Sequence, residues 1–401
     1  MMDKNNELKI AFYLVTDIQH IPPVVRLLPY LGGIIVTRNP EIYNHIKSKY
    51  PEVQNPLFLV KTHHHAQMMM VRKRIRMVIY PGFTTIYRGK SVQIFHGGLS
   101  DKNYVESLKI LLYHLVLFPG EKTRDKVEKS GYLKFIKNWE LVGYPKFDPL
   151  VNQNLQVDPI FRNGRKTILY APTWISRIKG SDMIRFSKYG ESSINIWAKE
   201  IIKSLYKDYN LIIKYHSRLV REKGDIYEQI DDLIKTLGAE STVVTRIDDN
   251  ILPYMYQSDL MISDISTACY EWFHFNRPIV YANPAPGKYF VSDDISSNTY
   301  AWQAGDVINN ADDIHGYVSE NIRTDKYQEI RNKLFNYTVY KPDGKATERQ
   351  AQAILNFYRK FEKTPYMWLM LSSWGWGRGR RFITKFVHRY YRWFKKEKVG
   401  K

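Results

Sequence analysis

Short apolar runs recur along the first part of the chain and alternate with polar or amphipathic segments. Runs that are apolar at nearly every position are typical of strands buried on both faces of a parallel sheet. The segments between them are long enough for helices that cover those faces. The pattern therefore predicts one Rossmann-like α/β domain over residues 1–150. Its expected strands are Ile10–Val15, Gly33–Val36, Leu57–Val60, Met77–Tyr80, Val92–Phe95 and Leu115–Phe118.

A second alternating series begins after Asn152–Arg165, which is polar, has no clear periodicity and is the expected linker. The series predicts a second Rossmann-like domain over residues 151–345. Its expected strands are Thr167–Tyr170, Leu211–Lys214, Val243–Val244, Leu260–Ile262 and Ile279–Tyr281, and its expected helices are Ile194–Tyr209 and Asp225–Leu237.

The segment Asp259–Asn283 has the pattern of a strand, a turn, a helix over 268–275 and a second strand. Asp264, Ser266 and Thr267 precede the helical part, and side chains of these types accept hydrogen bonds from the first N–H groups of a helix. Those N–H groups also suit a phosphate. The turn is thus either an ordinary helix cap or one wall of an anion site.

Polar residues also follow the other strands of the second domain. Thr173 and Trp174 follow the first strand, and Lys214 and His216 lie at the end of the next. The carboxyl ends of parallel strands share one edge of the sheet, so these residues are expected to converge with the turn at 264–267. A cation, an imidazole and a helix N-terminus around one crevice predict a pyrophosphate site.

In the first domain, His96, Gly97 and Gly98 follow the expected strand directly. A histidine at a strand end can act as a general base near neutral pH, and glycines leave room for a substrate. A structural histidine that bonds a nearby carbonyl fits the position equally well.

Other chemistry-bearing residues carry weaker signals. The run at 63–65 is three histidines, but adjacent side chains on a helix point apart and no carboxylate stands at ligand spacing, so no metal site is predicted. Cys269 is the single cysteine, which excludes an internal disulfide framework and a cysteine-rich zinc site. Its place within the expected helix favours a packed core thiol over a nucleophile.

The chain has 401 residues and a formal net charge of +20, which favours an anionic partner: a membrane surface, a nucleic acid or a phosphorylated substrate. The start of the sequence lacks the apolar core and cleavage site of a signal peptide. No run approaches the roughly 18 apolar residues of a membrane span. We expect a cytoplasmic protein, with attachment to a membrane face left open.

The last residues, 363–401, form a tail of different composition that follows an expected crossover helix at 346–362. Aromatic and basic residues recur at helical spacing there and fall mostly on different faces, as in helices that lie in an anionic membrane interface. Docking on the protein's own core is the alternative, and no nucleic-acid-binding motif accompanies the tail. The expected membrane-binding residues are Trp368, Trp374, Trp376, Arg380, Arg381, Lys385, Arg389 and Trp393.

Several short segments resemble, in their order, those of the CDP-glycerol glycerophosphotransferase family, which builds teichoic acids and related phosphopolymers on a GT-B scaffold. They are His96-Gly97, Gly143-Tyr144-Pro145-Lys146-Phe147-Asp148, Tyr170-Ala171-Pro172-Thr173-Trp174, Ser263-Asp264-Ile265-Ser266-Thr267, Asn276-Arg277-Pro278, and Asp343-Gly344-Lys345-Ala346-Thr347 with Arg349. The family usually continues His-Gly-Thr-x-x-Lys, whereas this chain has Gly98-Leu99-Ser100-Asp101 after Gly97, and Ser217 replaces the proline of the family's Arg-x-His-Pro.

The resemblance implies an α/β, GT-B-like fold, with two Rossmann-like domains facing across a cleft and a C-terminal amphipathic tail. It implies a cytidine-diphosphate donor on the second domain and an acceptor on the first. The implied donor-phosphate ligands are Lys214, His216, Asp264, Ser266 and Thr267, with Thr173 and Trp174 supporting the donor side. The implied catalytic histidines are His96, as base for the acceptor hydroxyl, and His216. Gly97 and Gly98 would lie on the acceptor side.

The expected function is metal-independent transfer of glycerol phosphate from CDP-glycerol, a substrate and not a cofactor, to a hydroxyl of a lipid-linked polymer or saccharide. The enzyme would lie peripherally on the inner face of the cell membrane, with no nucleic-acid partner. Two alternatives stay open. One is a GT-B glycosyltransferase that uses a nucleotide-activated sugar or another CDP-polyol, and the other is a non-catalytic basic protein that binds membranes or nucleic acid.

Overall fold

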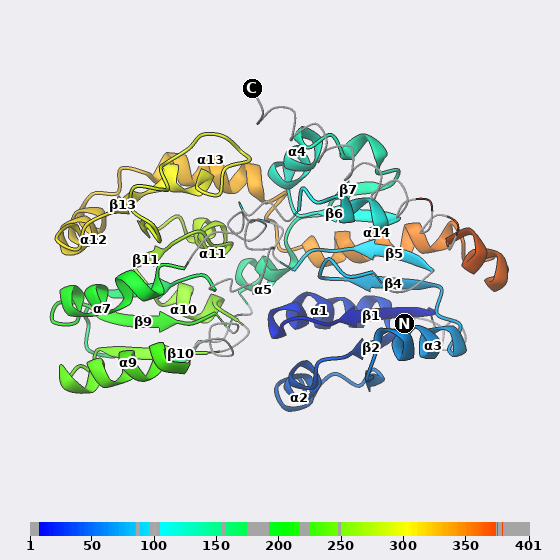
Figure 1. The fold of residues 1–401 in the computed structure, drawn as a ribbon, viewed down its shortest axis with the longest axis horizontal. Helices are drawn as coiled ribbons and strands as arrows, with labels where there is room; N and C mark the ends of the chain where they lie inside the picture. Colours follow the sequence, from blue (N-terminus) through cyan, green and yellow to red (C-terminus); the bar gives the residue numbers. More distant parts are fainter. Residues whose placement is uncertain are drawn as a thin grey trace, which may run out of the picture.

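A computed structural model describes residues 8–85, 89–96, 99, 101, 105–153, 155, 157–174, 192–216, 224–247, 250–373, 375 and 379. Two parallel sheets lie side by side, each with its own helices (Figure 1). The expectation of a two-domain, GT-B-like α/β fold is confirmed. Gly97, Gly98 and all of the tail residues expected to bind membranes, apart from Trp368, lie outside the described residues.

The first sheet has seven strands in the order β3-β2-β1-β4-β5-β6-β7, and all of its pairs are parallel. Its strands are β1 Ile10–Leu14, β2 Ile34–Thr37, β3 Leu57–Leu59, β4 Met77–Tyr80, β5 Lys90–Gln93, β6 Leu115–Phe118 and β7 Trp139–Leu141. Its helices are α1 Ile21–Leu31, α2 Pro40–Lys49, α3 His63–Arg72, α4 Glu121–Lys129 and α5 Asp148–Val151. The six predicted strands are present, and the partly exposed edge strand β7 is additional.

The second sheet has six parallel strands in the order β10-β9-β8-β11-β12-β13. Its strands are β8 Thr167–Ala171, β9 Asn210–Lys214, β10 Val243–Arg246, β11 Leu260–Ser263, β12 Ile279–Ala282 and β13 Asp306–Ile308. Its helices are α7 Ile194–Leu205, α9 Gly224–Thr236, α10 Leu252–Tyr256, α11 Ala268–Trp272, α12 Asp313–Arg323 and α13 Gln328–Thr338. The short strand β13 was not predicted.

In both sheets, the direction in which the chain adds strands reverses once. In each one the chain winds outward from a central strand and then restarts on that strand's other side, at β1 and β4 in the first sheet and at β8 and β11 in the second. Ligands of open parallel sheets bind beyond the carboxyl ends of the strands at such a switch point. The topology therefore marks one candidate site in each domain.

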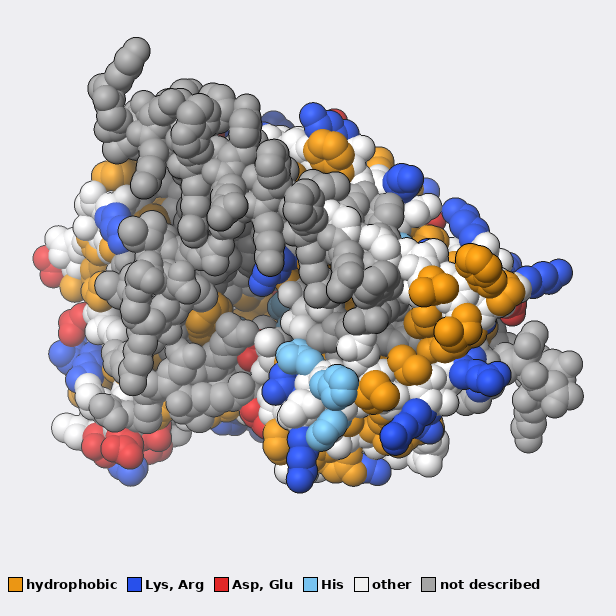
Figure 2. Space-filling view, turned by 45° about the vertical axis from the view of Figure 1, so that its right-hand side comes forward, with side chains coloured by type: hydrophobic (Ala, Val, Ile, Leu, Met, Phe, Trp, Pro, Cys, Tyr) orange, Lys and Arg blue, Asp and Glu red, His pale blue; other side chains and the backbone are white. Residues whose placement is uncertain are grey.

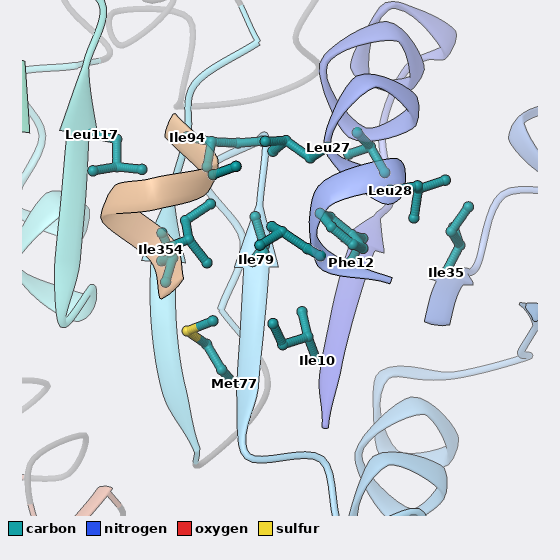
Figure 3. Packing of buried hydrophobic residues seen from close by; sticks show 14 of the residues in the cluster. Ile10, Phe12, Leu27, Leu28, Ile35, Met77, Ile79, Ile94, Leu117 and Ile354 are labelled. Atoms are coloured by element: carbon teal, nitrogen blue, oxygen red, sulfur yellow. The ribbon is translucent and has the colours of Figure 1, made fainter. Parts of the chain in front are cut away.

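The helix expected at 346–362 returns to the first domain. Helix α14, Ala346–Arg359, packs against α1, and Ile354 lies among Ile79, Ile94 and Leu117 of the first core (Figure 3). Its first turn is capped by the buried Asp148, whose two carboxylate oxygens accept from the N–H groups of Ala346 (3.1 Å) and Thr347 (2.7 Å). Asp148 thus joins two of the motifs on which the resemblance rests.

No helix within the described part of the chain is both long and apolar enough to cross a bilayer. A helix over 366–373 follows α14. Its Leu369 is buried in the first core, whereas Met367, Trp368 and Leu371 are more than half exposed.

Candidate functional site

The switch point of the second sheet brings together residues from three strand ends. The Thr173 N–H, beyond β8, donates to both carboxylate oxygens of Asp264, beyond β11, at 2.9 and 3.1 Å. The rings of Trp174 and His216, beyond β8 and β9, lie 6.5 Å apart between centroids. The expected convergence of strand ends is therefore seen for these residues.

Asp264 binds the protein's own backbone and does not cap the following helix as expected. Its carboxylate is 1% exposed and accepts two further hydrogen bonds, from the N–H and the hydroxyl of Ser193, each at 2.9 Å. These donors precede α7, so one carboxylate holds the loop after β8 and the start of α7 in place. Because its oxygens are satisfied by protein donors, the geometry favours positioning of the site over direct contact with a phosphate.

The rest of the turn is less enclosed. Ser266 and Thr267 are partly exposed, and the Ser266 hydroxyl accepts from the N–H of Ala268 at 3.3 Å. The helix continues as α11 and a 3-10 turn, Phe273–Phe275, which matches the predicted extent of 268–275. Cys269 is fully buried, and burial raises the pKa of its thiol to about 12, so it is unsuited to be a nucleophile.

Lys214 is the last residue of β9 and is 7% exposed. Its ammonium donates to the carbonyl oxygen of Tyr215 at 3.0 Å. The backbone of His216 continues beyond the strand, and its ring faces Trp174. Lys214 and His216 thus lie at the end of β9 and the turn at 264–267 at the end of β11, on either side of β8 at the same edge of the sheet.

In the first domain, the predicted strand before His96 ends earlier than expected. Strand β5 stops at Gln93, and Phe95 adopts a left-handed backbone conformation (φ 49°). The Gln93 side chain stabilises this turn by accepting from the Phe95 N–H (2.9 Å) and donating to the Gly82 carbonyl (3.2 Å). His96 therefore follows a fixed turn and not the strand itself.

A hydrogen bond to the protein backbone helps to orient the His96 ring. Its Nδ1 lies 2.9 Å from the carbonyl oxygen of Pro81, beyond β4. A carbonyl can only accept, so Nδ1 carries the proton, and the neutral ring then has its lone pair on Nε2. The bond to a carbonyl expected of a structural histidine is present, and it also leaves Nε2 in the form that a general base requires.

A second histidine, which sequence reasoning missed, lies against His96. His20 follows β1 in the 3-10 turn Ile18–His20, is 3% exposed, and its ring centroid is 3.9 Å from that of His96. His20 lies beyond β1, at the first switch point, and His96 lies beyond β5, the strand next to β4. The rule applied to the second domain, that polar residues follow strand ends, would have singled out Thr16, Asp17 and His20.

The segment at 143–148 links the two sites. The Tyr144 hydroxyl donates to a carboxylate oxygen of Glu271 at 2.8 Å and also lies 3.1 Å from the His96 carbonyl oxygen. The other Glu271 oxygen forms an ion pair with Lys146 at 2.7 Å. Because Glu271 belongs to α11, the helix that follows the turn at 264–267 is bound to Tyr144 and Lys146 of the first domain, and the Tyr144 hydroxyl lies beside the backbone of His96.

A buried cluster around Asp101 makes a second connection between the domains. The Asp101 carboxylate pairs with the ammonium of Lys122 (2.6 Å) and accepts from the hydroxyl of Tyr270 (2.6 Å) and the N–H of Ala301 (2.9 Å). Asp101 stands where the family usually has a lysine. Here that position is 5% exposed and joins the domains.

The three histidines at 63–65 are exposed on α3, and histidine side chains gather beside basic and hydrophobic ones on the face shown in Figure 2. His63 accepts from or donates to the Tyr13 hydroxyl at 2.8 Å. Among the described residues, no group of three His, Cys, Asp or Glu side chains is placed to hold a metal ion.

Comparison with known proteins gives a family match over residues 127–356, to the model described as CDP-Glycerol:Poly(glycerophosphate) glycerophosphotransferase. A teichoic acid poly(ribitol-phosphate) polymerase of Bacillus spizizenii is 23% identical over 252 residues. That alignment covers 61% of this chain and 37% of the polymerase, so the chain spans just over a third of the relative's length. The resemblance inferred from the motifs is confirmed.

Solved structures share the fold. A structure of the wall teichoic acid polymerase TagF is 15% identical, covers 90% of this chain and 92% of its own, and has a TM-score of 0.56. A TagF variant soaked with CDPG is 14% identical, with 88% and 90% covered and a TM-score of 0.57. MnaA of S. aureus with UDP is 14% identical, with 89% and 98% covered and a TM-score of 0.56.

Proposed function

Since the chain belongs to the CDP-glycerol:poly(glycerophosphate) glycerophosphotransferase family, we propose that it transfers glycerol phosphate from CDP-glycerol to a hydroxyl of a membrane-linked acceptor in the synthesis of a cell-surface phosphopolymer. The observation that carries this proposal is the 2.9 Å contact between Nδ1 of His96 and the carbonyl oxygen of Pro81. The carbonyl of Pro81 fixes the proton on Nδ1, so Nε2 is the atom that can take a proton from an acceptor hydroxyl.

In the proposed reaction, Nε2 of His96 takes the proton of the acceptor hydroxyl as its oxygen attacks the glycerol-bound phosphorus of the donor. A new oxygen–phosphorus bond forms, the bond from that phosphorus to the bridging oxygen breaks, and CMP leaves with the bonding electron pair. Lys214, His216 and the turn at Ser266 and Thr267 would hold the phosphates. Catalysis would come mainly from positioning and charge stabilisation.

The donor side would be supported by residues that do not contact the phosphate: Asp264, Thr173 and Trp174. The Asp264 carboxylate is bound to the loop after β8 and to Ser193, so it would fix the shape of the phosphate site without touching the phosphate. The described residues offer cationic and imidazole side chains for the donor, and we propose that the transfer needs no metal ion. Turnover that survives exhaustive treatment with EDTA would agree with this, and loss that Mg²⁺ restores would contradict it.

The test of the transferase is release of CMP from CDP-glycerol, with solubilised membranes as acceptor. His96→Asn removes the base but keeps a polar side chain of similar size, and we expect turnover to fall by about 10²- to 10⁴-fold. The donor is bound elsewhere, so its dissociation constant should be unchanged. His216→Asn should instead weaken donor binding. Full turnover in His96→Asn would rule out the proposed base.

A related donor is the second candidate, because the polymerase from Bacillus spizizenii is named for ribitol phosphate. A CDP-polyol other than CDP-glycerol, or a nucleotide sugar, would use the same phosphate site. Titration with CDP-glycerol, CDP-ribitol, CDP, UDP and GDP separates these cases. Selectivity for cytidine supports the family reaction, and preference for uridine or guanosine supports a glycosyltransferase.

We further propose peripheral attachment to an anionic membrane through the C-terminal part of the chain, on the inner face of the cell membrane. The net charge of +20 and the exposed apolar side chains of Met367, Trp368 and Leu371 support it. Vesicles containing anionic lipid should bind the full chain, and Trp368→Ala should weaken that binding. Equal binding to neutral vesicles would contradict the proposed attraction between the basic chain and anionic lipid.

A further inference from the structure

We propose that helix α3 and the helix over 366–373 form one docking surface, which places the first domain on an anionic lipid bilayer. The inference deepens the proposed attachment through the C-terminal part of the chain and rests on it. It adds α3, which belongs to the body of the first domain and lies far from that part in the sequence. The domain that carries His96 would then be the one that faces the bilayer.

Helix α3 presents apolar side chains on its outer side as well as on its inner side. Ala66 and Met70 are buried in the core of the first domain. Met68 and Val71 lie on the other side of the helix and are 42% and 39% exposed. Residues three apart on a helix are neighbours on one face, so these two side chains form an outward apolar stripe. A surface helix normally has polar residues there, so the core of the domain does not explain the stripe.

The helix over 366–373 lies beside α3 and also carries outward apolar side chains. Its Met370 packs against the same buried cluster as Met70 of α3. The guanidinium of Arg76, just after α3, donates to the carbonyl of Phe361 at 2.7 Å, which joins the segment before this helix to the end of α3. The outward side chains are 54–68% exposed and belong to Met367, Trp368 and Leu371.

The charge around these apolar side chains is complementary to an anionic lipid surface. Residues 61–76 include five Lys or Arg and no Asp or Glu. Of these, Arg72, Lys73 and Arg74 are exposed at the end of α3. On the face shown in Figure 2, hydrophobic side chains lie next to one another with Lys and Arg side chains around them. Exposed apolar residues among basic ones are typical of surfaces that enter an anionic bilayer, whereas binding of nucleic acid depends on the basic residues.

The single cysteine of the chain allows a direct test. Cys269 is fully buried and burial raises the pKa of its thiol to about 12, so in the folded protein a thiol reagent labels a cysteine introduced at the surface. Val71→Cys places an environment-sensitive nitrobenzoxadiazole label on α3. Ile330→Cys, on α13 of the second domain, is the matched control, because both natural side chains are 39% exposed.

The probe is a vesicle of phosphatidylglycerol and phosphatidylcholine, and vesicles of phosphatidylcholine alone are its control. We expect the emission of the label at position 71 to shift to the blue when the anionic vesicles are added, and a quencher on the lipid chains to reduce it. The label at position 330 should not respond.

Charge reversal in the unlabelled full chain tests the basic part of the surface. Arg72→Glu, in the last turn of α3, should weaken binding to the anionic vesicles by about 5- to 20-fold. Lys235→Glu is the matched control, because Lys235 is exposed in the last turn of α9 and its reversal changes the net charge equally. It should leave binding within about 2-fold of the natural chain.

The results distinguish this inference from the proposed attachment. If Trp368→Ala weakens binding while Arg72→Glu and the label at position 71 show no response, the attachment stands and the role of α3 is wrong. If the anionic vesicles do not bind the full chain, both are wrong. Thermal melts show whether a loss of binding comes from unfolding, and the label at position 71 decides the matter if Arg72→Glu does not fold.

Two other occupants of this surface would also overturn the inference. Emission at position 71 that is blue-shifted without vesicles and returns to the red on dilution would show that a second copy of the chain covers α3. Binding of duplex DNA that Arg72→Glu abolishes, with no response of the label to vesicles, would assign the basic residues to a nucleic acid.

Discussion

Replacing Asp101 by asparagine should destabilise the protein by about 3 kcal/mol, because it removes the charge that balances a buried ammonium. The side chain of Lys122 has no exposed surface, and its Nζ lies 2.6 Å from Asp101. Burial lowers the pKa of Lys122 to about 8, while the neighbouring carboxylate acts to raise it. The ammonium therefore depends on Asp101 for its charged form.

Removing one partner of a buried pair costs about 3–5 kcal/mol. The cost is limited here because Lys122 keeps the Leu99 carbonyl at 2.8 Å and can lose its proton. Proton loss becomes easier as the pH rises, so the difference between Asp101→Asn and the natural chain should be larger at about pH 6 than at about pH 9. The asparagine amide oxygen can still accept from the Tyr270 hydroxyl and from Lys122, which keeps the cost near the lower end of the range, although the NH₂ group then faces the N–H of Ala301.

Denaturant unfolding followed by tryptophan fluorescence measures this loss, with each domain's transition fitted separately. Tyr270→Phe removes one hydrogen bond to Asp101 and should cost about 1 kcal/mol. Lys203→Ala, which breaks a largely exposed pair with Glu200, is the control and should cost less than about 1 kcal/mol. A loss below about 1 kcal/mol for Asp101→Asn, or one independent of pH, would refute the reasoning.

Two further predictions concern the turn after β11. Asp264→Asn turns one acceptor oxygen into a donor that faces the N–H of Thr173 or Ser193. We expect the free energy of unfolding to fall by about 1–3 kcal/mol and a titration to show weaker binding of CDP-glycerol. Unchanged affinity for CDP-glycerol would contradict the support role of Asp264. Because burial raises the pKa of the Cys269 thiol to about 12, the folded protein should resist iodoacetamide at about pH 9 and react once it is unfolded. The stability of the fold should fall as the pH rises above about 8.5, the pKa of the thiol in the unfolded chain. Rapid alkylation of the folded chain would contradict both expectations.

The sequence was informative wherever a structural feature is local. Strands buried on both faces are continuous apolar runs, so β1, β4 and β6 could be predicted from the sequence alone. The edge strand β7 could not, because its residues are partly exposed and Trp139–Leu141 has no such run. The same rule fails for β13, which is three residues long and begins with an aspartate.

For the candidate sites, the sequence predicted only which residues follow the ends of strands. Residue types and topology indicated that Thr173, His216 and Asp264 would converge, but the partners of Asp264 were not foreseeable. Its carboxylate binds Ser193, 71 residues away in the sequence, and nothing local to either residue signals that contact. The same holds for His20 and His96, whose contact depends on the order of β1, β4 and β5 in the sheet.

The two candidate sites are not mechanically independent, and helix α11 is the reason. Its N-terminal end follows the turn at Ser266 and Thr267, and its next residues reach the first domain: Tyr270 donates to Asp101, and Glu271 binds Tyr144 and Lys146. Tyr144 also lies 3.1 Å from the carbonyl of His96. A change in the angle between the domains must therefore break these buried contacts or move the turn with the first domain. In the second case the proposed phosphate site and the proposed base would move together, which keeps the donor phosphorus and the acceptor hydroxyl in register.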